Sequence, residues 1–162
     1  MNIFFLHRHP STCAQYHCDK HVVKMILETC QLLCTFWHCL DPDHEIYTPP
    51  YKKTHLNHPC AKWVRESKKN YIWLCVLGKE LCIEYTFRYG KIHKCQKILN
   101  ELSSLYDVLP KNLSKDWIDP PQAMPEEYKS VDSVHAYRYY YKFDKSHLHS
   151  WKFREIPKFI LE

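Results

Sequence analysis

The sequence predicts an all-α fold, and three observations lead to that expectation. Apolar side chains recur every three or four residues along several stretches, which is the spacing of helices with one buried face. Only two glycines occur in 162 residues, whereas β-sandwiches and nucleotide-binding α/β folds need more for turns and phosphate loops. Hydrophobic residues make up 45% of the chain, enough for a real core. We therefore expect residues 1–162 to form one compact domain of four to five helices.

The first long helix is predicted over residues 13–39 and carries the most informative pattern of the chain. The apolar start before it, residues 1–6, is expected to be extended and to pack on the core. Ser11 or Thr12 is a suitable N-cap for this helix. The Asp-Pro-Asp run at residues 41–43 then ends it, because the residue before a proline disfavours helical geometry.

Three further helices are predicted, over residues 57–89, 92–106 and 131–143. The second long helix has Asn57 as N-cap, Pro59 in its first turn and Gly90 directly after its end. Residues 107–130 contain four prolines and are expected to cross the molecule as an ordered but irregular loop. The tail, residues 150–162, is expected to add one short helical turn and to dock on the rest.

The cysteines and the net charge indicate which cellular compartment and which kind of partner to expect. Nine cysteines are spread along predicted helices, several on apolar faces, and no CxxC pair occurs. Such cysteines behave as small hydrophobic residues in a reducing compartment, so we expect an intracellular protein. For a viral protein that means the cytoplasm or nucleus of a host cell. No apolar run approaches the length of a membrane span, and the formal charge of +5 permits an anionic partner.

A line of polar side chains runs along the first predicted helix. His17, His21, Lys24 and Glu28 follow one another at i, i+4, i+7 and i+11, so a continuous helix places them on one face. A solvated face is the ordinary interpretation of such a line. However, Lys before Glu is the weaker orientation for a surface ion pair, which favours a functional role for Glu28. Glu28 is therefore our first candidate for acid–base chemistry.

The histidines also allow a second interpretation, a zinc-dependent hydrolase. His17 and His21 are one turn apart on a helix face, and His58 and Cys60 lie near a helix start. The HExxH motif is absent, and so is any tight Cys/His signature. The structural alternative for His58 is that it helps to cap its helix.

Basic and aromatic side chains form a third candidate site. Lysine and arginine neutralise phosphates, and aromatic faces stack on exposed bases, so the pattern is typical of a surface that binds nucleic acid. Three consecutive tyrosines at 139–141 cannot all face the core. We assign ten residues to contact with DNA: His17, His21, His58, Lys62, Arg65, Lys69, Arg88, Tyr139, Tyr140 and Lys142.

Three segments together resemble the pyrimidine-dimer DNA glycosylases, the family typified by viral endonuclease V. They are Asp19-x-His21 followed by Glu28, the Asn-His-Pro start at 57–59 with its Arg-Tyr-Gly end at 88–90, and the aromatic, basic run at 139–142. The resemblance covers most of the chain in order. It implies an endonuclease V-like all-α fold and no metal or other cofactor. It also implies double-stranded DNA, damaged or modified, as the partner, and we expect a monomer.

The resemblance further implies a chemistry. Members of the family use a free α-amine that attacks the sugar carbon at the damaged base, forms a Schiff base and cleaves the strand by β-elimination. Carried over, Glu28 takes the role of the family glutamate, and His21 with nearby basic residues meets phosphates. The expected function is a DNA glycosylase, with AP-lyase activity as a further possibility, that excises a damaged or modified pyrimidine.

The amine itself has three candidates: Met1, Asn2 and Lys24. The family nucleophile is a small residue exposed by methionine removal, whereas Asn2 favours retention of Met1. An α-amine titrates near pH 8 and a lysine near 10.4, so Lys24 needs desolvation or a neighbouring cation. We therefore favour the chain terminus. The altered terminus also motivates an alternative function: a DNA-binding or DNA-modification accessory protein on the same scaffold, without glycosylase chemistry.

Overall fold

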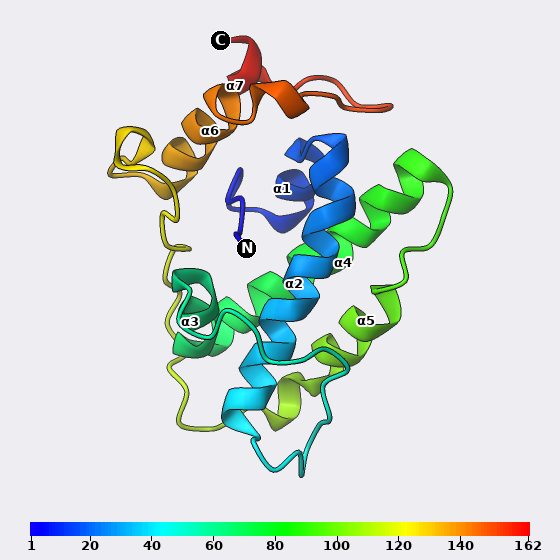
Figure 1. The fold of residues 1–162 in the computed structure, drawn as a ribbon, viewed down its shortest axis with the longest axis vertical. Coiled ribbons are helices and arrows are strands. Elements are labelled where there is room, and N and C mark those ends of the chain that lie inside the picture. The colour runs from blue at the N-terminus through cyan, green and yellow to red at the C-terminus, as the bar shows by residue number, and fades with distance from the viewer.

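The computed structural model describes residues 1–162 and contains helices but no β-sheet, so the all-α prediction is confirmed (Figure 1). The α-helices are α1 (Pro10–Tyr16), α2 (Asp19–Leu40), α3 (Pro59–Glu66), α4 (Lys68–Tyr89), α5 (Gln96–Ser104), α6 (Ser133–Phe143) and α7 (Lys158–Leu161). Short 3₁₀ helices cover Leu105–Val108, Glu126–Tyr128 and Ser146–Leu148. The seven α-helices exceed the predicted four to five, mainly because two predicted long helices are each broken once.

The first break lies at His17 and Cys18, whose extended backbones separate α1 from α2. Cys18 N donates to Tyr141 Oη at 2.8 Å, and His17 O accepts from Arg88 Nη1 at 2.9 Å. Both partners come from distant parts of the chain, so the apolar periodicity of residues 13–39 does not indicate the break. The helix also starts earlier than predicted, with Pro10 in its first turn and His9 as N-cap.

The second break lies at Ser67, which has a fully extended backbone between α3 and α4. Its hydroxyl accepts from Lys69 N at 3.0 Å and from Asn70 N at 3.3 Å. These are the bonds of an N-cap, so Ser67 ends one helix and starts the next. Ser67 also forms an isolated β-bridge with Ser114 in the crossing loop, in which Lys68 N donates to Ser114 O at 2.9 Å.

The ends of the predicted 57–89 helix agree closely with the structure. His58, rather than Asn57, is the N-cap, and its Nδ1 accepts from Cys60 N at 3.1 Å. Pro59 occupies the first helical position, where its missing N–H costs nothing. Gly90 ends α4 in the left-handed conformation with φ 65°, as predicted.

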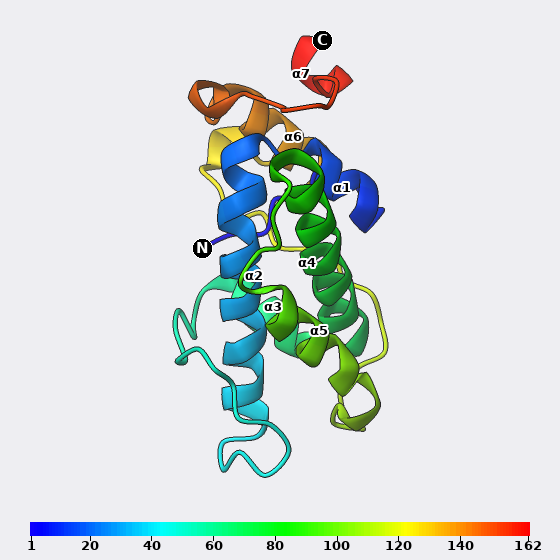
Figure 2. The same cartoon turned by 90° about the vertical axis from the view of Figure 1, so that its right-hand side faces the viewer.

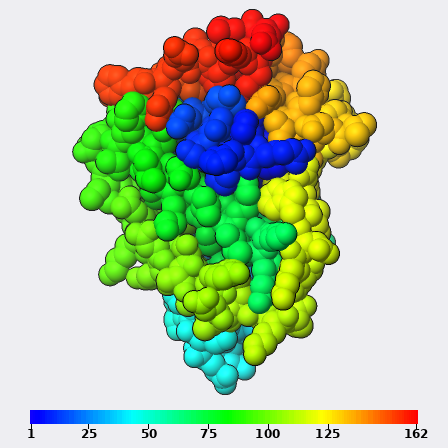
Figure 3. Space-filling view, turned by 180° about the vertical axis from the view of Figure 1, so that it is seen from behind, coloured from blue at the N-terminus to red at the C-terminus, as the bar shows by residue number.

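The helices enclose one cluster of buried hydrophobic side chains, with α2 and α4 side by side at its centre (Figures 1 and 2). Helix α4 contacts α1, α2, α3 and α5, which explains why it is apolar on most of its sides. Residues Ile3–Leu6 are buried, as expected for the apolar start. From behind, the N-terminal part is bordered by the crossing loop and the C-terminal segment (Figure 3). None of the helices combines the length and hydropathy of a membrane span.

Arg88, at the end of α4, joins that helix to the break between α1 and α2. Its guanidinium donates to Glu84 Oε1 at 2.8 Å and to Asp19 Oδ1 at 2.9 Å. The same group donates to the carbonyls of His17 at 2.9 Å and Gln15 at 3.0 Å. The side chain is fully buried, so its charge is balanced by these partners alone.

The two carboxylates that pair with Arg88 also hold the C-terminal segment. Asp19 accepts from Ser150 Oγ at 2.6 Å and from Lys152 N at 2.9 Å. Glu84 accepts from Arg154 at 2.9 and 3.0 Å. The pKa values of both carboxyl groups lie below their ordinary values, because the hydrogen bonds and charges of these partners outweigh the effect of burial. The tail is therefore docked, as the sequence predicted.

We expect Arg88→Met to lower the free energy of unfolding by about 3–5 kcal/mol, because it leaves Asp19 and Glu84 without their shared buried cation. Urea denaturation at neutral pH measures the change. Arg8→Met is the matched control, since Arg8 pairs with Asp119 and Asp132 while its side chain stays 55% exposed. The control should cost less than about 1 kcal/mol. Equal losses in the two variants would contradict the role given to Arg88.

Candidate active site

A polar cavity of about 260 Å³ opens where the start of the chain meets α2 and the end of α6. In Figure 1 the N-terminus lies between these two helices. The cavity is lined by Met1, Asn2, Phe4, His21, Lys24, Met25, Glu28, Tyr140 and Lys145. It therefore brings together the four residues predicted as catalytic and two of those predicted to contact DNA.

Glu28 is the centre of this cavity, with its side chain 13% exposed. Asn2 N donates to Glu28 Oε2 at 3.1 Å. On the other carboxylate oxygen, Lys24 Nζ lies 3.6 Å from Oε1, and the Lys24 side chain is 68% exposed. The backbone nitrogen of residue 2 and the ammonium of Lys24 thus lie at the two oxygens of the same carboxylate.

The carboxamide of Asn2 ties the chain start to three other segments. Its Oδ1 accepts from Ile3 N at 2.8 Å and from Tyr137 Oη, on α6, at 3.1 Å. Its Nδ2 donates to Ala123 O, in the crossing loop, at 3.0 Å. The thiol of Cys60, on α3, lies 3.7 Å from Oδ1. Both ends of the carboxamide are therefore occupied.

His21 is a neutral side chain at the cavity wall rather than a cation. Its Nδ1 lies 2.9 Å from Tyr141 Oη, which also accepts from Cys18 N. Phe4 stacks on the ring at a centroid distance of 4.4 Å. Burial first, and then the neighbouring His17, lower the pKa of His21 to about 3.

His58 lies close to the chain terminus without lining the cavity. Its pKa is lowered by partial burial and then by the positive charge of the terminal amine, while Glu28 acts in the opposite direction. Because Nδ1 accepts the capping bond from Cys60 N, the neutral ring carries its proton on Nε2. The structural interpretation of His58 as a helix cap is therefore confirmed.

Three residues that the sequence assigned to DNA contact are instead buried. His21 is 5% exposed but lines the Glu28 cavity, whereas His17 and Arg88 are each 1% exposed and do not line it, so neither presents a side chain to a duplex. The helix break is the reason: it removes His17 from the polar line of α2 and turns its Nδ1 towards Cys13 O at 2.7 Å. Arg88 is held at the same break by Asp19 and the α1 carbonyls. Their roles in this structure are to hold the break together.

The other predicted contacts lie on separate surfaces. Lys62 is exposed on α3, and Arg65 donates from Nη2 to Leu56 O at 2.9 Å. On α6, Tyr139 and Lys142 line a hollow of about 330 Å³ with Arg138. None of these five side chains lines the Glu28 cavity.

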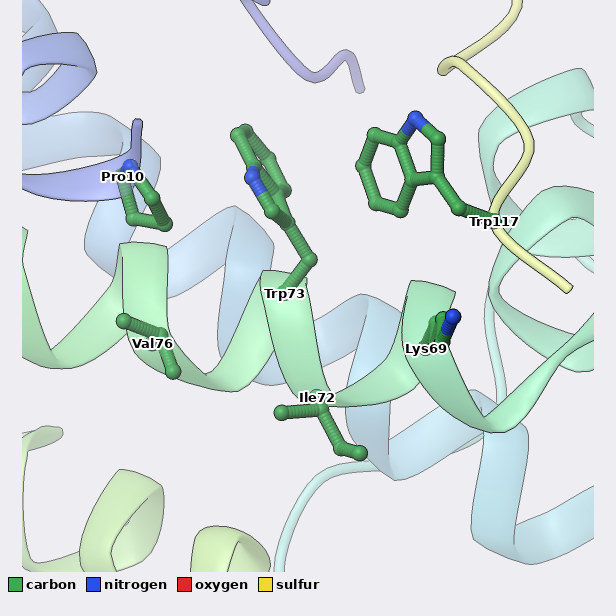
Figure 4. Close-up of a pocket in the computed structure, with 6 residues that line it drawn as sticks. All are labelled: Pro10, Lys69, Ile72, Trp73, Val76 and Trp117. Atoms are coloured by element: carbon green, nitrogen blue, oxygen red, sulfur yellow. The ribbon is translucent and has the colours of Figure 1, made fainter. Parts of the chain in front are cut away.

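Lys69 belongs to an apolar groove of about 370 Å³ along α4. Figure 4 shows Trp73 and Trp117 on one side of the helix, with Pro10 beside them and Ile72 and Val76 on the helix itself. The groove contains no carboxylate and no histidine. It offers no acid–base pair, in contrast to the Glu28 cavity.

The histidines of the zinc interpretation do not form a metal site. No group of three or more His, Cys, Asp or Glu side chains is arranged to hold a metal ion. His17 and His21 direct their Nδ1 atoms to different partners, Cys13 O and Tyr141 Oη.

A family model described as pyrimidine dimer DNA glycosylase matches residues 1–97 of the 162-residue chain. The chain belongs to the pyrimidine dimer DNA glycosylase family. This confirms the resemblance and gives the chain a function of the pyrimidine-dimer-glycosylase type, with DNA as substrate. No curated protein and no solved structure shows significant similarity to it.

The match to the glycosylase family covers only one side of the cavity. The chain start and α2 lie within residues 1–97, whereas Tyr140 and Lys145 come from the C-terminal third. Lys145, Tyr137 and Tyr141 belong to the basic, aromatic run that the sequence predicts as a nucleic-acid surface, but they are not among the ten residues assigned to DNA contact. The i, i+4 spacing of the two tyrosines was a visible signal for one inward face of α6, but nothing local indicated that this face meets residues 2 and 21.

We expect the protein to lose stability as the pH falls below about 6.5, because burial lowers the pKa of His17 to about 4. Between these values the unfolded chain binds a proton that the folded chain excludes, so acid favours unfolding. For His17 this amounts to about 2 kcal/mol between about pH 7 and about pH 5. The fall is complete once the pH passes below the folded pKa.

Urea denaturation at the two pH values measures this dependence in the wild type and in His17→Gln. The variant should show a smaller fall, with His21 still contributing its share. His9→Gln, at an exposed histidine, should behave as the wild type does. An unchanged pH dependence in His17→Gln would rule out the assignment.

Proposed function

We propose that this chain is a DNA glycosylase with AP-lyase activity, which excises a damaged or modified pyrimidine with an amine at the chain start and with Glu28. The observation that carries the proposal is the 3.1 Å hydrogen bond from Asn2 N to Glu28 Oε2, since it holds the chain start against a carboxylate inside a polar cavity. Family membership supports the reaction class.

In the proposed reaction the amine lone pair forms a bond to the sugar carbon C1′ while the bond from C1′ to the base breaks. The base leaves with the bonding electrons and takes up a proton. The nitrogen then loses a proton, the bond from C1′ to O4′ breaks as O4′ takes up a proton, and the nitrogen lone pair forms the C1′=N bond of the Schiff base. Loss of a proton from C2′ breaks the bond from C3′ to the 3′ phosphate, which leaves with the bonding electrons. Glu28 is placed to move these protons, because it is within hydrogen-bonding distance of the backbone nitrogen of residue 2.

The lining of the cavity suits a nucleotide turned out of the duplex. A glycosylase must expose its target, and the extruded base needs aromatic faces and hydrogen-bond donors. Here Tyr140 supplies a face, and His21 supplies a neutral imidazole, which carries one N–H. Lys24 and Lys145 supply positive charge at the rim, where flanking phosphates would lie.

We also propose DNA contacts for residues outside the Glu28 cavity. Tyr139 and Lys142 are next to Tyr140 on α6, so we assign them to the strand beside the reacting nucleotide. Lys62, Arg65, Lys69 and His58 are assigned to more distant phosphates. We propose that the protein acts as a monomer on double-stranded DNA and requires no metal or cofactor.

Glu28→Gln should lower base release by about 10²- to 10⁴-fold, because the amide cannot transfer the protons of the reaction. DNA binding should survive, since the substitution keeps the shape of the side chain and removes a negative charge. Single-turnover base release on photodamaged duplexes and a binding titration measure the two properties. Glu80→Gln on α4, outside the cavity, is the control. Wild-type base release in Glu28→Gln would exclude the catalytic assignment.

Borohydride should trap a covalent adduct between the wild-type protein and abasic duplex DNA, and peptide mapping should place it at the chain terminus. Lys24→Arg should still form the adduct, because its side chain is 68% exposed and lies on the solvent side of Glu28. Lys20→Arg, at an exposed lysine of the same helix, is the control. An adduct on Lys24, or full lyase activity with an acetylated terminus, would reassign the nucleophile. Clean DNA binding without adduct or base release would favour the accessory protein.

A further inference from the structure

We propose that Asn2 is a positioning residue, whose carboxamide holds the chain start in the geometry that the reaction with Glu28 requires. The inference rests on the proposed function and adds to it a residue that acts through another group. It does not depend on whether Met1 stays in place. With Met1 removed, the nitrogen of residue 2 is the reacting amine. With Met1 in place that nitrogen is an amide, the reacting amine is that of Met1 one residue before it, and the carboxamide acts on that amine by fixing residue 2.

The first argument is a closed ring of hydrogen bonds. Asn2 Nδ2 donates to Ala123 O at 3.0 Å, Ala123 N donates to Tyr137 Oη at 3.3 Å, and Tyr137 Oη donates to Asn2 Oδ1 at 3.1 Å. Tyr137 has one phenol hydrogen, and Pro121 O accepts it together with Asn2 Oδ1. Each member therefore orients the next, and Asn2 is the member that belongs to the chain start.

The second argument is that the Asn2 carboxamide makes most of the hydrogen bonds that hold the first two residues, beside the one bond from Asn2 N to Glu28. Chain ends fray unless side chains or backbone bonds hold them. Met1 is only half buried, and the buried apolar segment begins at Ile3. Asn2 bridges these two parts, because its Oδ1 also accepts from Ile3 N at 2.8 Å. The bond from Asn2 N to Glu28 thus leaves from a residue whose side chain is fixed at both ends.

The third argument concerns the residue type. The ring needs a donor towards Ala123 O and an acceptor towards Tyr137 Oη and Ile3 N, and a carboxamide at this length offers both. Aspartate would keep the acceptor but set a carboxylate against the Ala123 carbonyl and add negative charge beside Glu28. Alanine would remove both functions.

Misplacement of a reacting group by about 1 Å can cost about 10²-fold in rate. We therefore expect Asn2→Ala, compared with wild type at the same state of Met1 (retained or removed, established by mass spectrometry), to slow borohydride-trapped adduct formation on abasic duplexes by about 10²-fold. DNA affinity should match that of Asn100→Ala, an exposed asparagine on α5. In Asn2→Asp, the pH midpoint of adduct formation should rise, because the added carboxylate stabilises the protonated amine.

Tyr137→Phe tests the ring through its other member. It should slow adduct formation less than Asn2→Ala, and it should cause little further loss when both substitutions are combined, because the two residues act through one network. Wild-type rates in Asn2→Ala would overturn the proposal. So would a parallel loss of DNA binding and adduct formation, which would indicate a merely structural role.

A readout without DNA separates this proposal from the proposed function. The Ile3 amide, bonded to Asn2 Oδ1, should exchange its hydrogen slowly in the wild type and at least about tenfold faster in Asn2→Ala. If the Ile3 amide of the wild type is protected from exchange but no adduct is trapped, both the amine chemistry and the positioning role are rejected. The hydrogen bonds of the Asn2 carboxamide would still stand. Adduct formation with an unprotected Ile3 would reject the positioning role alone.

Discussion

The buried charge of Arg88 is the constraint on which the rest of the structure depends. A guanidinium without solvent must be matched by carboxylates and carbonyls, and here these come from α2, from α4 itself and from the last turn of α1. Gln15, in the last turn of α1, and His17, at the break, both accept from Arg88, so the guanidinium caps the carbonyl end of α1 where that helix stops. The same two carboxylates then bind residues 150–154, so one cation fixes the relative positions of α1, α2, α4 and the C-terminal segment.

The break that Arg88 stabilises also orients the wall of the cavity. At the break the backbone N–H of Cys18 has no helical partner and donates instead to Tyr141. The same hydroxyl lies within hydrogen-bonding distance of His21, which burial keeps neutral and which lines the cavity. The buried ion pair at one end of α4 and the wall of the Glu28 cavity are thus linked through the start of α2.

The sequence predicted the fold class, the apolar start and the helix end at Gly90, because all three follow from local patterns. The resemblance to the glycosylases directed attention to Glu28, and the polar line of α2 held for His21, Lys24 and Glu28. The polar line does not include His17, because Arg88 and Tyr141 bind the backbone at His17 and Cys18, where the helix breaks. The sequence also predicted Arg88 as a DNA contact, because a sequence shows a charged residue but not the carboxylates with which it pairs in the interior. Nor could local patterns indicate that Tyr137 meets Asn2.

The bond between Asn2 and Tyr137 joins residues 135 positions apart, almost the full length of the chain. Contacts of such separation form late in folding, because the loop they close is long. During synthesis the first residues leave the ribosome well before α6 has been made, so the chain start lacks its hydrogen-bond ring for most of translation. The nascent chain therefore carries the glutamate and the amine without the arrangement that brings them together, and the site is assembled only once the C-terminal third has folded onto it.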